Sequence, residues 1–316
     1  MMKTKIPSLS YNAMFKAVIA NNKYILSALV KSILDYYNLN IDITNKELII
    51  KNNELAIDNY KDKQLICDYI IKIDDRNEIN IEINRSKYLG LSERNLTYSF
   101  KIYYEHFNSG DDYYEFGSYT LLQVNFNNYR NPNDKSINRY YMIDADDIEN
   151  RLSNNFSILN IDIARCQEIV YNKDNLEGIT DLEVFGAIIA CEYLEDISSI
   201  LERGLLFMSE NDKERMVNDI KRASEDKDTL KAIKLENSLE ERIAWIEACA
   251  IRHAKEEGMK QGIEQGIEQG IEQGIKQGIE QNTNNMIKSM LEEKLDYQII
   301  SNITGKSIDY IKNIEK

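Results

Sequence analysis

Hydrophobic positions predict helices at the start of the chain and a strand pair soon after it. From about Ser10 to Asn38 apolar residues recur every three or four positions, which predicts one or two helices. In residues 41–83 the stretches LICDYIIKI and INIEIN alternate polar and apolar residues around the turn residues DDRN. This alternation predicts a β-hairpin. A further helix is predicted from Ser92 to about Phe107, with Ser92 as its N-cap.

The rest of the chain changes from strands to helices. YTLLQVNF (Tyr119–Phe126) and RYYMI (Arg139–Ile143) have the composition of short strands, whereas the following segment is rich in charge and patterned as amphipathic helices. We therefore expect an α/β core followed by an all-helical C-terminal region. The expected parts are a core domain over 1–145, a helical domain over 146–257, a repeat over 258–281 and a short helical tail over 282–316.

The repeat is the sequence GMKQGIEQGIEQGIEQGIKQGIEQ, in which glycine and isoleucine each recur every fourth residue. In an α-helix this period forms one slowly winding glycine stripe beside one isoleucine stripe. Each interior glycine costs about 1 kcal/mol relative to alanine, so an isolated helix would be marginal. We expect the repeat to form a helix against a partner, either a second copy in a homo-oligomer or the helical domain of its own chain. A flexible linker is the alternative.

The tail resembles the end of a helix-turn-helix. LDYQIISNI is followed by a turn at Thr304–Gly305 and by Ser307, which is placed to cap SIDYIKNI. Because acidic residues offset the lysines of this tail, we expect it to serve packing or assembly rather than to read DNA bases.

Composition narrows the class of protein. No run approaches the roughly 20 apolar residues of a membrane helix, and the N-terminus lacks a signal-peptide core, so we expect a cytoplasmic protein with no membrane partner. Four dispersed cysteines and two histidines argue against a zinc site and a disulfide framework. The net charge is −14, but residues 1–125 hold 15 Lys+Arg against 16 Asp+Glu. The acidity lies in the second part, so a nucleic-acid site in the first part is not excluded.

The hairpin carries the candidate chemistry. Alternation places Asp68 on one face of the first strand and Glu82 on one face of the second. A three- or five-residue loop around Asp75 would bring the two carboxylates directly opposite each other, whereas an even-numbered loop would separate them. Two carboxylates at about 5 Å repel unless a cation such as Mg²⁺ lies between them. The alternative is an ordinary hairpin with one face in water.

A set of short motifs, in this order and spacing, resembles the PD-(D/E)XK nuclease superfamily. The motifs are Asp68, then Glu82-Ile83-Asn84, then Arg94-x-x-x-Tyr98. More narrowly, the chain resembles the Rpn family of recombination-promoting nucleases and transposases. The supporting segments are SYNAMFKAVI, GDDYYEF, LLQVNF and the Gly-Ile-Glu-Gln repeat near the C-terminus.

The resemblance implies a restriction-endonuclease-like core, a mixed sheet flanked by helices, and metal-dependent endonuclease activity on DNA. It implies that Asp68 and Glu82 bind Mg²⁺ or Mn²⁺ with the carbonyl of Ile83. The third catalytic position, usually Lys or Gln, is Asn84 here, and Asn12 stands where relatives have an acid. Because of these two departures, the alternative is a catalytically weakened or inactive member of the same fold that has a DNA-binding or regulatory role. A third alternative is a helical assembly protein.

Several side chains near these motifs are candidates for binding DNA phosphates. Lys72 lies on the polar face of the hairpin, where it would either supply the missing cation or be an ordinary solvated lysine. The others surround the predicted helix after Glu82; they are Arg85, Lys87, Arg94, Tyr98 and Lys101. The alternative is a mixed-charge helix face held by packing of Arg94 on Tyr98.

Overall fold

The computed structural model describes residues 3–44, 46–51, 67–88, 90–107, 119–205 and 207–315. Contacts divide the chain into two compact units, Met1–Ala244 and Trp245–Lys316. The predicted motif GDDYYEF lies outside the described residues.

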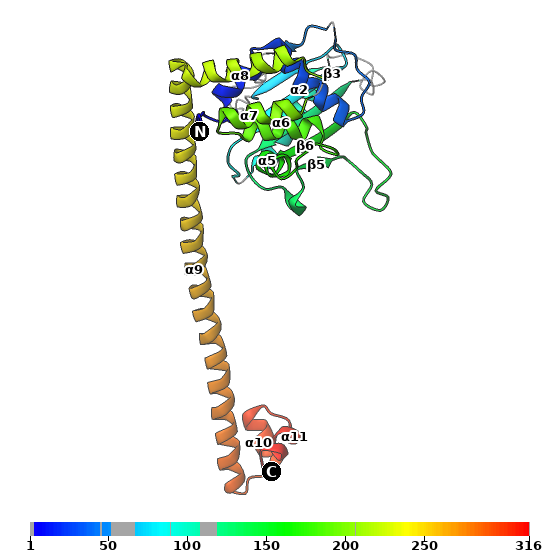
Figure 1. Ribbon diagram of the computed structural model, residues 1–316. Helices are drawn as coiled ribbons and strands as arrows, with labels where there is room; N and C mark the ends of the chain where they lie inside the picture. The colour runs from blue at the N-terminus through cyan, green and yellow to red at the C-terminus, as the bar shows by residue number, and fades with distance from the viewer. Residues whose placement is uncertain are drawn as a thin grey trace. The chain divides into compact units, whose positions relative to one another are not determined.

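The first unit is built on a mixed six-stranded sheet flanked by helices (Figure 1). The three central strands are parallel, and antiparallel strands lie on both sides of them. The sheet order is β1-β2-β3-β4-β6-β5, with β1 at Ile49–Ile50, β2 at Tyr69–Lys72, β3 at Asn77–Asn84, β4 at Thr120–Asn127, β5 at Ile137–Tyr140 and β6 at Phe156–Asp162. This arrangement confirms the predicted fold class.

Strands β2 and β3 form the predicted hairpin. The Ile73 backbone N–H donates to the Asn77 carbonyl at 3.0 Å, so the loop between them has three residues. Tyr69 pairs with Ile81, and the next pair along therefore sets Asp68 opposite Glu82. Of the two registers that the sequence left open, the structure has the odd-numbered loop, which sets the two carboxylates opposite each other.

One face of the sheet forms the main hydrophobic core. Side chains such as Ile71, Ile81 and Val124 alternate onto this face. They pack against helices that precede and follow the strands along the chain. These elements are α1 (Asn12–Phe15), the π-helical turn η1 (Lys16–Ala20), α2 (Lys23–Tyr36), α5 (Ile163–Tyr171), α6 (Asp181–Ala190), α7 (Leu194–Arg203) and α8 (Glu210–Glu225).

Helix α3 (Leu91–Glu105) covers the opposite face. Its N-cap is Gly90, which has φ of +84°, and not Ser92 as predicted. Ser92 lies one residue inside the helix, because the chain enters it through the left-handed glycine. Beneath α3 a small apolar cluster includes Ile70, Tyr98 and Leu121.

The polar face of the hairpin lies on the α3 side and is buried. Four polar side chains of β3 have an exposed fraction of 5% or less, and they are Glu78, Asn80, Glu82 and Asn84. The face is therefore not the water-exposed surface of an ordinary hairpin.

Part of the segment expected to be helical contributes to the sheet. Strand β6 pairs with β4 and β5 although it lies beyond residue 145, and β5 ends at Tyr140 rather than at Ile143. FSILNID has buried residues on both faces and so lacks a clear period of two, which is why the sequence analysis placed it in the helical segment. Beyond β4 there is also a short 3-10 turn, η2 (Pro132–Asp134).

Helix α9 (Lys227–Glu292) runs through the repeat, so the repeat is helical. The isoleucines of the repeat are more than half exposed. Around each of its six glycines, from Gly258 to Gly278, the space that a Cβ would occupy is open. The tail forms α10 (Tyr297–Thr304) and α11 (Ile308–Glu315), joined at Gly305 with φ of +69°. Ile287, Ile300 and Ile311 form their core.

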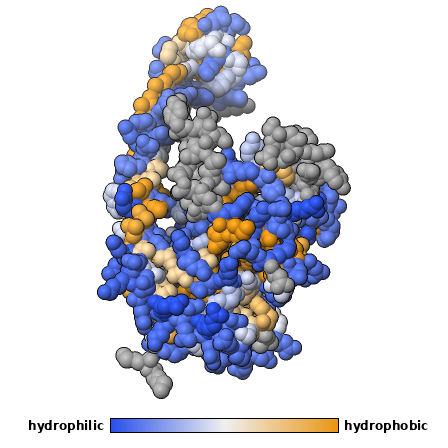
Figure 2. All heavy atoms as spheres, turned by 90° about the horizontal axis from the view of Figure 1, so that it is seen from above, coloured by the Kyte–Doolittle hydropathy of each residue, from blue (hydrophilic) through white to orange (hydrophobic). Residues whose placement is uncertain are grey.

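The surface is mainly polar. Figure 2 shows hydrophilic side chains over most of the face in view, with hydrophobic side chains in separate patches between them. None of the helices in the described ranges combines the length and apolar character needed to cross a membrane.

Candidate active site

Asp68 and Glu82 are joined through backbone and side-chain hydrogen bonds. The Asp68 N–H donates to Glu82 Oε1 at 3.1 Å, and the Ile83 N–H donates to Asp68 Oδ2 at 2.7 Å. Glu82 is only 1% exposed, whereas Asp68 is half-buried at the end of β2. The hairpin thus places the two carboxylates beside each other, each accepting a hydrogen bond from the backbone of the other strand.

The carbonyl of Ile83 points to the same side as the carboxylate of Asp68. In a strand, the N–H and C=O of one residue face the same neighbouring strand. The Ile83 N–H reaches Asp68, whereas the carbonyl of the next residue, Asn84, accepts from Asn128 N on the other side at 2.8 Å. The Ile83 carbonyl therefore lies on the β2 side of β3, as the Asp68 carboxylate does.

Arg94 of α3 is the cation that contacts this pair. Its Nη2 donates to Glu82 Oε2 at 3.3 Å and to Asn84 Oδ1 at 2.9 Å. Its guanidinium also lies over the rings of Tyr88 and Tyr98, with centroid distances of 5.5 and 5.3 Å. The one-turn spacing of Arg94 and Tyr98 explains why both side chains face the sheet together.

Burial raises the pKa of both acids. For Glu82 the largest cause is loss of water, followed by the neighbouring charge of Asp68, while Arg94 opposes the shift. For Asp68 burial also dominates, and the hydrogen bond from Ile83 opposes it. Burial therefore disfavours the ionised form of both acids, and the charge of Arg94 offsets part of that cost.

The donor set fits a divalent cation. Within the described ranges no group of three or more His, Cys, Asp and Glu side chains forms a metal site. Mg²⁺, however, commonly takes one or two carboxylates and keeps several waters. Asp68, Glu82 and the Ile83 carbonyl match that requirement, and a bound cation would stabilise the ionised form of both acids.

Asn12 belongs to the site and is itself held from two directions. Its Nδ2 donates to Asp68 Oδ1 at 2.9 Å, and its Oδ1 accepts from the Tyr69 hydroxyl at 2.5 Å. The backbone N–H groups of Asn12 and Ala13 donate to the carboxylate of Glu236 at 2.9 and 2.8 Å. Sequence reasoning missed Glu236, because it lies in α9, far from the other motifs along the chain.

Both the oxygen and the nitrogen of the Asn84 side-chain amide make a hydrogen bond. Its Oδ1 accepts from Arg94, and its Nδ2 donates to Asn127 Oδ1 at 2.9 Å. Asn84 therefore holds the arginine of α3 in place.

A ladder of buried amides crosses the sheet from β3 to β6. Asn80 Nδ2 donates to Gln123 Oε1 at 2.8 Å, Gln123 Nε2 to Asn125 Oδ1 at 2.7 Å, and Asn125 Nδ2 to Asn160 Oδ1 at 2.8 Å. The alternating amides in NIEIN and LLQVNFN were the sequence signal for this ladder, which the sequence analysis did not use.

Two predicted DNA-contacting residues lie near the site but are already engaged. The guanidinium of Arg85 lies 3.5 Å from the ring centroid of Tyr11, and its Nη1 donates to Asn237 Oδ1 at 2.9 Å. Lys87 is exposed, and its Nζ lies 5.9 Å from the ring centroid of Tyr129.

Two other predicted contacts are not brought to the carboxylate pair. Lys72 lies at the turn end of the hairpin, where its Nζ contacts Asp75 at 2.6 Å. Four residues of strand separate it from Asp68, or roughly 13 Å. Lys101 lies two turns along α3 from Arg94 and contacts Glu105 at 3.5 Å.

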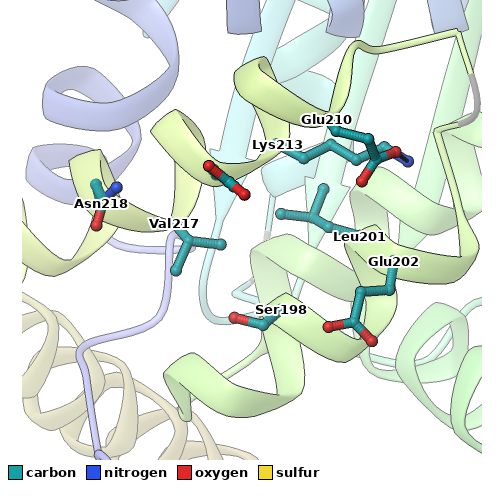
Figure 3. A pocket seen from close by; sticks show the side chains of 8 residues that line it. Ser198, Leu201, Glu202, Glu210, Lys213, Val217 and Asn218 are labelled. Carbon is teal, nitrogen blue, oxygen red and sulfur yellow. Dashed lines mark hydrogen bonds and ion pairs between the residues drawn. The ribbon is translucent and has the colours of Figure 1, made fainter.

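A separate cavity of about 340 Å³ lies between α7 and α8 (Figure 3). It contains three glutamates, Glu202, Glu210 and Glu214, and the Nζ of Lys213 contacts Glu210 at 3.0 Å. None of the predicted site residues lines it, so the carboxylate pair at the hairpin remains the candidate site.

Comparisons with known proteins agree with the motifs. The family model of the PD-(D/E)XK nuclease family transposases matches residues 11–227, a range that contains Asp68, Glu82 and Arg94. Searches of curated proteins and of solved structures gave no significant match. Because the family model covers more than half of the 316 residues, the resemblance predicted from the motifs is confirmed. The chain belongs to the PD-(D/E)XK nuclease family transposases.

Proposed function

We propose that this protein is a metal-dependent endonuclease that hydrolyses phosphodiester bonds in DNA. The observation that carries the proposal is the cross-strand pair of Asp68, which is half-buried, and Glu82, which is buried. Hydrogen bonds hold the two carboxylates side by side, and Arg94 contacts Glu82. Family membership supports the same reaction class. Burying two acids side by side lowers stability, which favours a functional role over a structural one.

Each group has a defined part in the proposal. Asp68, Glu82 and the Ile83 carbonyl would hold Mg²⁺ or Mn²⁺, which supplies an activated water and offsets phosphate charge. Arg94, whose planar guanidinium pairs well with phosphate oxygens, would add positive charge on the Glu82 side. Asn12 would orient Asp68, and Asn84 would orient Arg94.

Other basic residues are proposed to hold the DNA backbone. Lys87 is exposed beside the site, and Lys101 follows on the same helix as Arg94 and Tyr98. Arg85 would contact phosphate only after leaving Asn237 and Glu240. Such contacts position DNA without reading its sequence.

Cleavage of supercoiled plasmid by the full-length protein tests the proposal, with Mg²⁺, Mn²⁺ or EDTA. Glu82→Gln should reduce metal-dependent nicking by more than about 100-fold, since residues that merely support a metal ligand are worth about 10–100-fold. Glu78→Gln is the matched control, because Glu78 is equally buried on the same face of β3 but contacts Lys51. Folded protein that cuts with no metal, or a Glu82→Gln variant that cuts normally, would overturn the proposal.

The position of Asn84 favours a second candidate, a DNA-binding member with weak or absent cleavage. Its amide is occupied by Arg94 and Asn127, and no lysine of the described chain makes a hydrogen bond or ion pair with Asp68 or Glu82. Salt-sensitive DNA binding without cleavage under any metal would support this second candidate over the first.

A further inference from the structure

A cavity of about 320 Å³ opens beside the candidate active site, on the α3 side of the sheet. Its floor is formed by β4 and β6 and its wall by the first turn of α3. The lining residues are Ser92, Asn95, Leu96, Asn125, Tyr129, Tyr140, Ile158 and Asn160.

The cavity continues the same cross-strand row as the carboxylate pair. Glu82 is in register with Asn125, and Asn125 is in register with Asn160. Neighbouring strands lie about 4.8 Å apart, so the cavity floor begins one strand from Glu82. The wall is connected as well, because Asn95 Oδ1 accepts from the Arg94 guanidinium that contacts Glu82.

The lining is polar but uncharged. None of the eight residues carries a formal charge, so the cavity suits a neutral group better than an ion or a phosphate. The side-chain amide nitrogen of Asn160 and the hydroxyls of Tyr129 and Tyr140 make no hydrogen bond to another residue in the described ranges. These groups are therefore available to a ligand.

The chemistry of the lining matches a nucleobase. An amide presents a donor and an acceptor in one plane, as the edge of a base does, and tyrosine rings are stacking surfaces for bases. Burial raises the pKa of Tyr129 to about 12, while the charge of Arg94 opposes the shift. The volume is at the lower end of ligand pockets, enough for one small planar ring.

We propose that this cavity receives one nucleobase of the DNA strand bound at Asp68 and Glu82, so that the protein prefers DNA with an unpaired nucleotide next to the bound phosphate. This inference rests on the proposed function for the position of the strand. A base enters the cavity only when it is out of the stack, and an unpaired base reaches that state at the lowest cost.

Binding of three labelled duplexes to the full-length protein tests the inference. The duplexes share one sequence and are fully paired, contain one unpaired nucleotide, or contain an abasic residue at that place. Fluorescence anisotropy in Ca²⁺ gives the three dissociation constants, and cleavage in Mg²⁺ and Mn²⁺ is measured in parallel. The duplex with the unpaired nucleotide should bind about tenfold more tightly than the other two, as expected for one base stacked on an aromatic ring.

Two variants locate the preference in the cavity. Tyr140→Ala, which changes a side chain that is 42% exposed, and Asn160→Ala should each remove most of the preference while leaving the melting temperature nearly unchanged. Ser198→Phe, which fills the cavity of Figure 3 instead, is the matched control and should leave the preference intact.

The outcomes separate the two proposals. Equal affinity for all three duplexes, or a preference that survives both cavity variants, would overturn the nucleobase pocket even if the DNA is cut. A preference lost in both cavity variants, with no cleavage under any metal, would support the pocket and overturn the nuclease. Absence of binding to every duplex would overturn both.

Discussion

At the scale of single residues, the site holds two acidic side chains whose burial lowers the stability of the fold. Asp68 and Glu82 are held out of water next to each other, and burial raises the pKa of both. Arg94 contacts Glu82 at 3.3 Å and offsets part of the charge. A bound cation would complete the neutralisation, since the two carboxylates lie on adjacent strands.

We expect the stability of the metal-free protein to fall as the pH rises. The carboxyl pKa values are higher in the folded than in the unfolded state, so their contribution is fully present below the ordinary carboxyl range and is lost as the pH rises through the raised values. Thermal unfolding in EDTA across this range measures the loss, and Mg²⁺ should reverse it by binding the folded state. The Glu82→Gln variant should show a flatter pH dependence; a slope equal to that of the unchanged protein would contradict this account.

We expect that the positive charge supplied by Arg94 can be supplied instead by a lysine at position 84. Arg94→Met should reduce cleavage strongly, because it removes the charge beside Glu82 and leaves Asn84 Oδ1 unpaired. Asn84→Lys alone should destabilise the fold, since it places a second positive charge against Arg94. The double variant Asn84→Lys/Arg94→Met should regain both stability and cleavage relative to the single variants. Plasmid nicking and thermal unfolding of the four proteins test this, and additive losses in the double variant would contradict it.

At the scale of elements, the start of α9 completes the candidate site. Glu236 accepts the N–H groups of Asn12 and Ala13 at the beginning of α1, and one turn later Glu240 contacts Arg85 at 3.4 Å. The N-terminus of α1, where backbone N–H groups carry partial positive charge, favours the negative charge of Glu236. Residues beyond the family match, which ends at residue 227, therefore support Asn12 and through it Asp68.

Glu236→Ala should lower cleavage by about 10–100-fold and raise the metal concentration needed for half-maximal rate, as for other residues that support a metal ligand. Glu241→Ala is the control, because Glu241 is an exposed glutamate on the same helix. A Glu236→Ala variant with an unchanged metal requirement would show that Asn12 holds Asp68 without help from α9.

At the scale of the whole molecule, the C-terminal unit offers a surface that its own described residues leave uncovered. The repeat isoleucines of α9 are between 54% and 64% exposed, and the space beside each repeat glycine is open. We propose that this helix pairs with a second copy of the chain, with the glycines permitting close backbone approach and the isoleucines supplying apolar contact.

Light scattering across a range of protein concentrations should therefore show a homo-oligomer. Ile271→Asp, in the middle of the isoleucine stripe, should dissociate it while leaving the thermal unfolding of the nuclease unit unchanged. The exposed substitution Glu272→Ser is the matched control. A monomer at all concentrations would contradict the proposed pairing.

Local elements of this protein could be predicted from its amino-acid sequence alone. Period-2 alternation and the turn residues DDRN were sufficient to predict the hairpin and to limit its register to two alternatives. The structure has the one that sets Asp68 opposite Glu82. Order and spacing of the motifs were sufficient to predict the family. The helical start of the chain and the helical tail also followed from their local patterns.

Which residues meet across long distances in the chain depends on how the elements pack. Burial of the polar face under α3 and the ladder of amides depend on the pairing of β3 with β4 and of β4 with β6. Glu236 reaches Asn12 because α9 packs near α1, and no local pattern encodes that contact. Strand β6 was hidden among helical segments because a strand buried on both faces lacks a clear period. Local hydrogen bonding and side-chain periodicity can be read along a chain, whereas contacts made by packing arise only when the whole sheet is assembled.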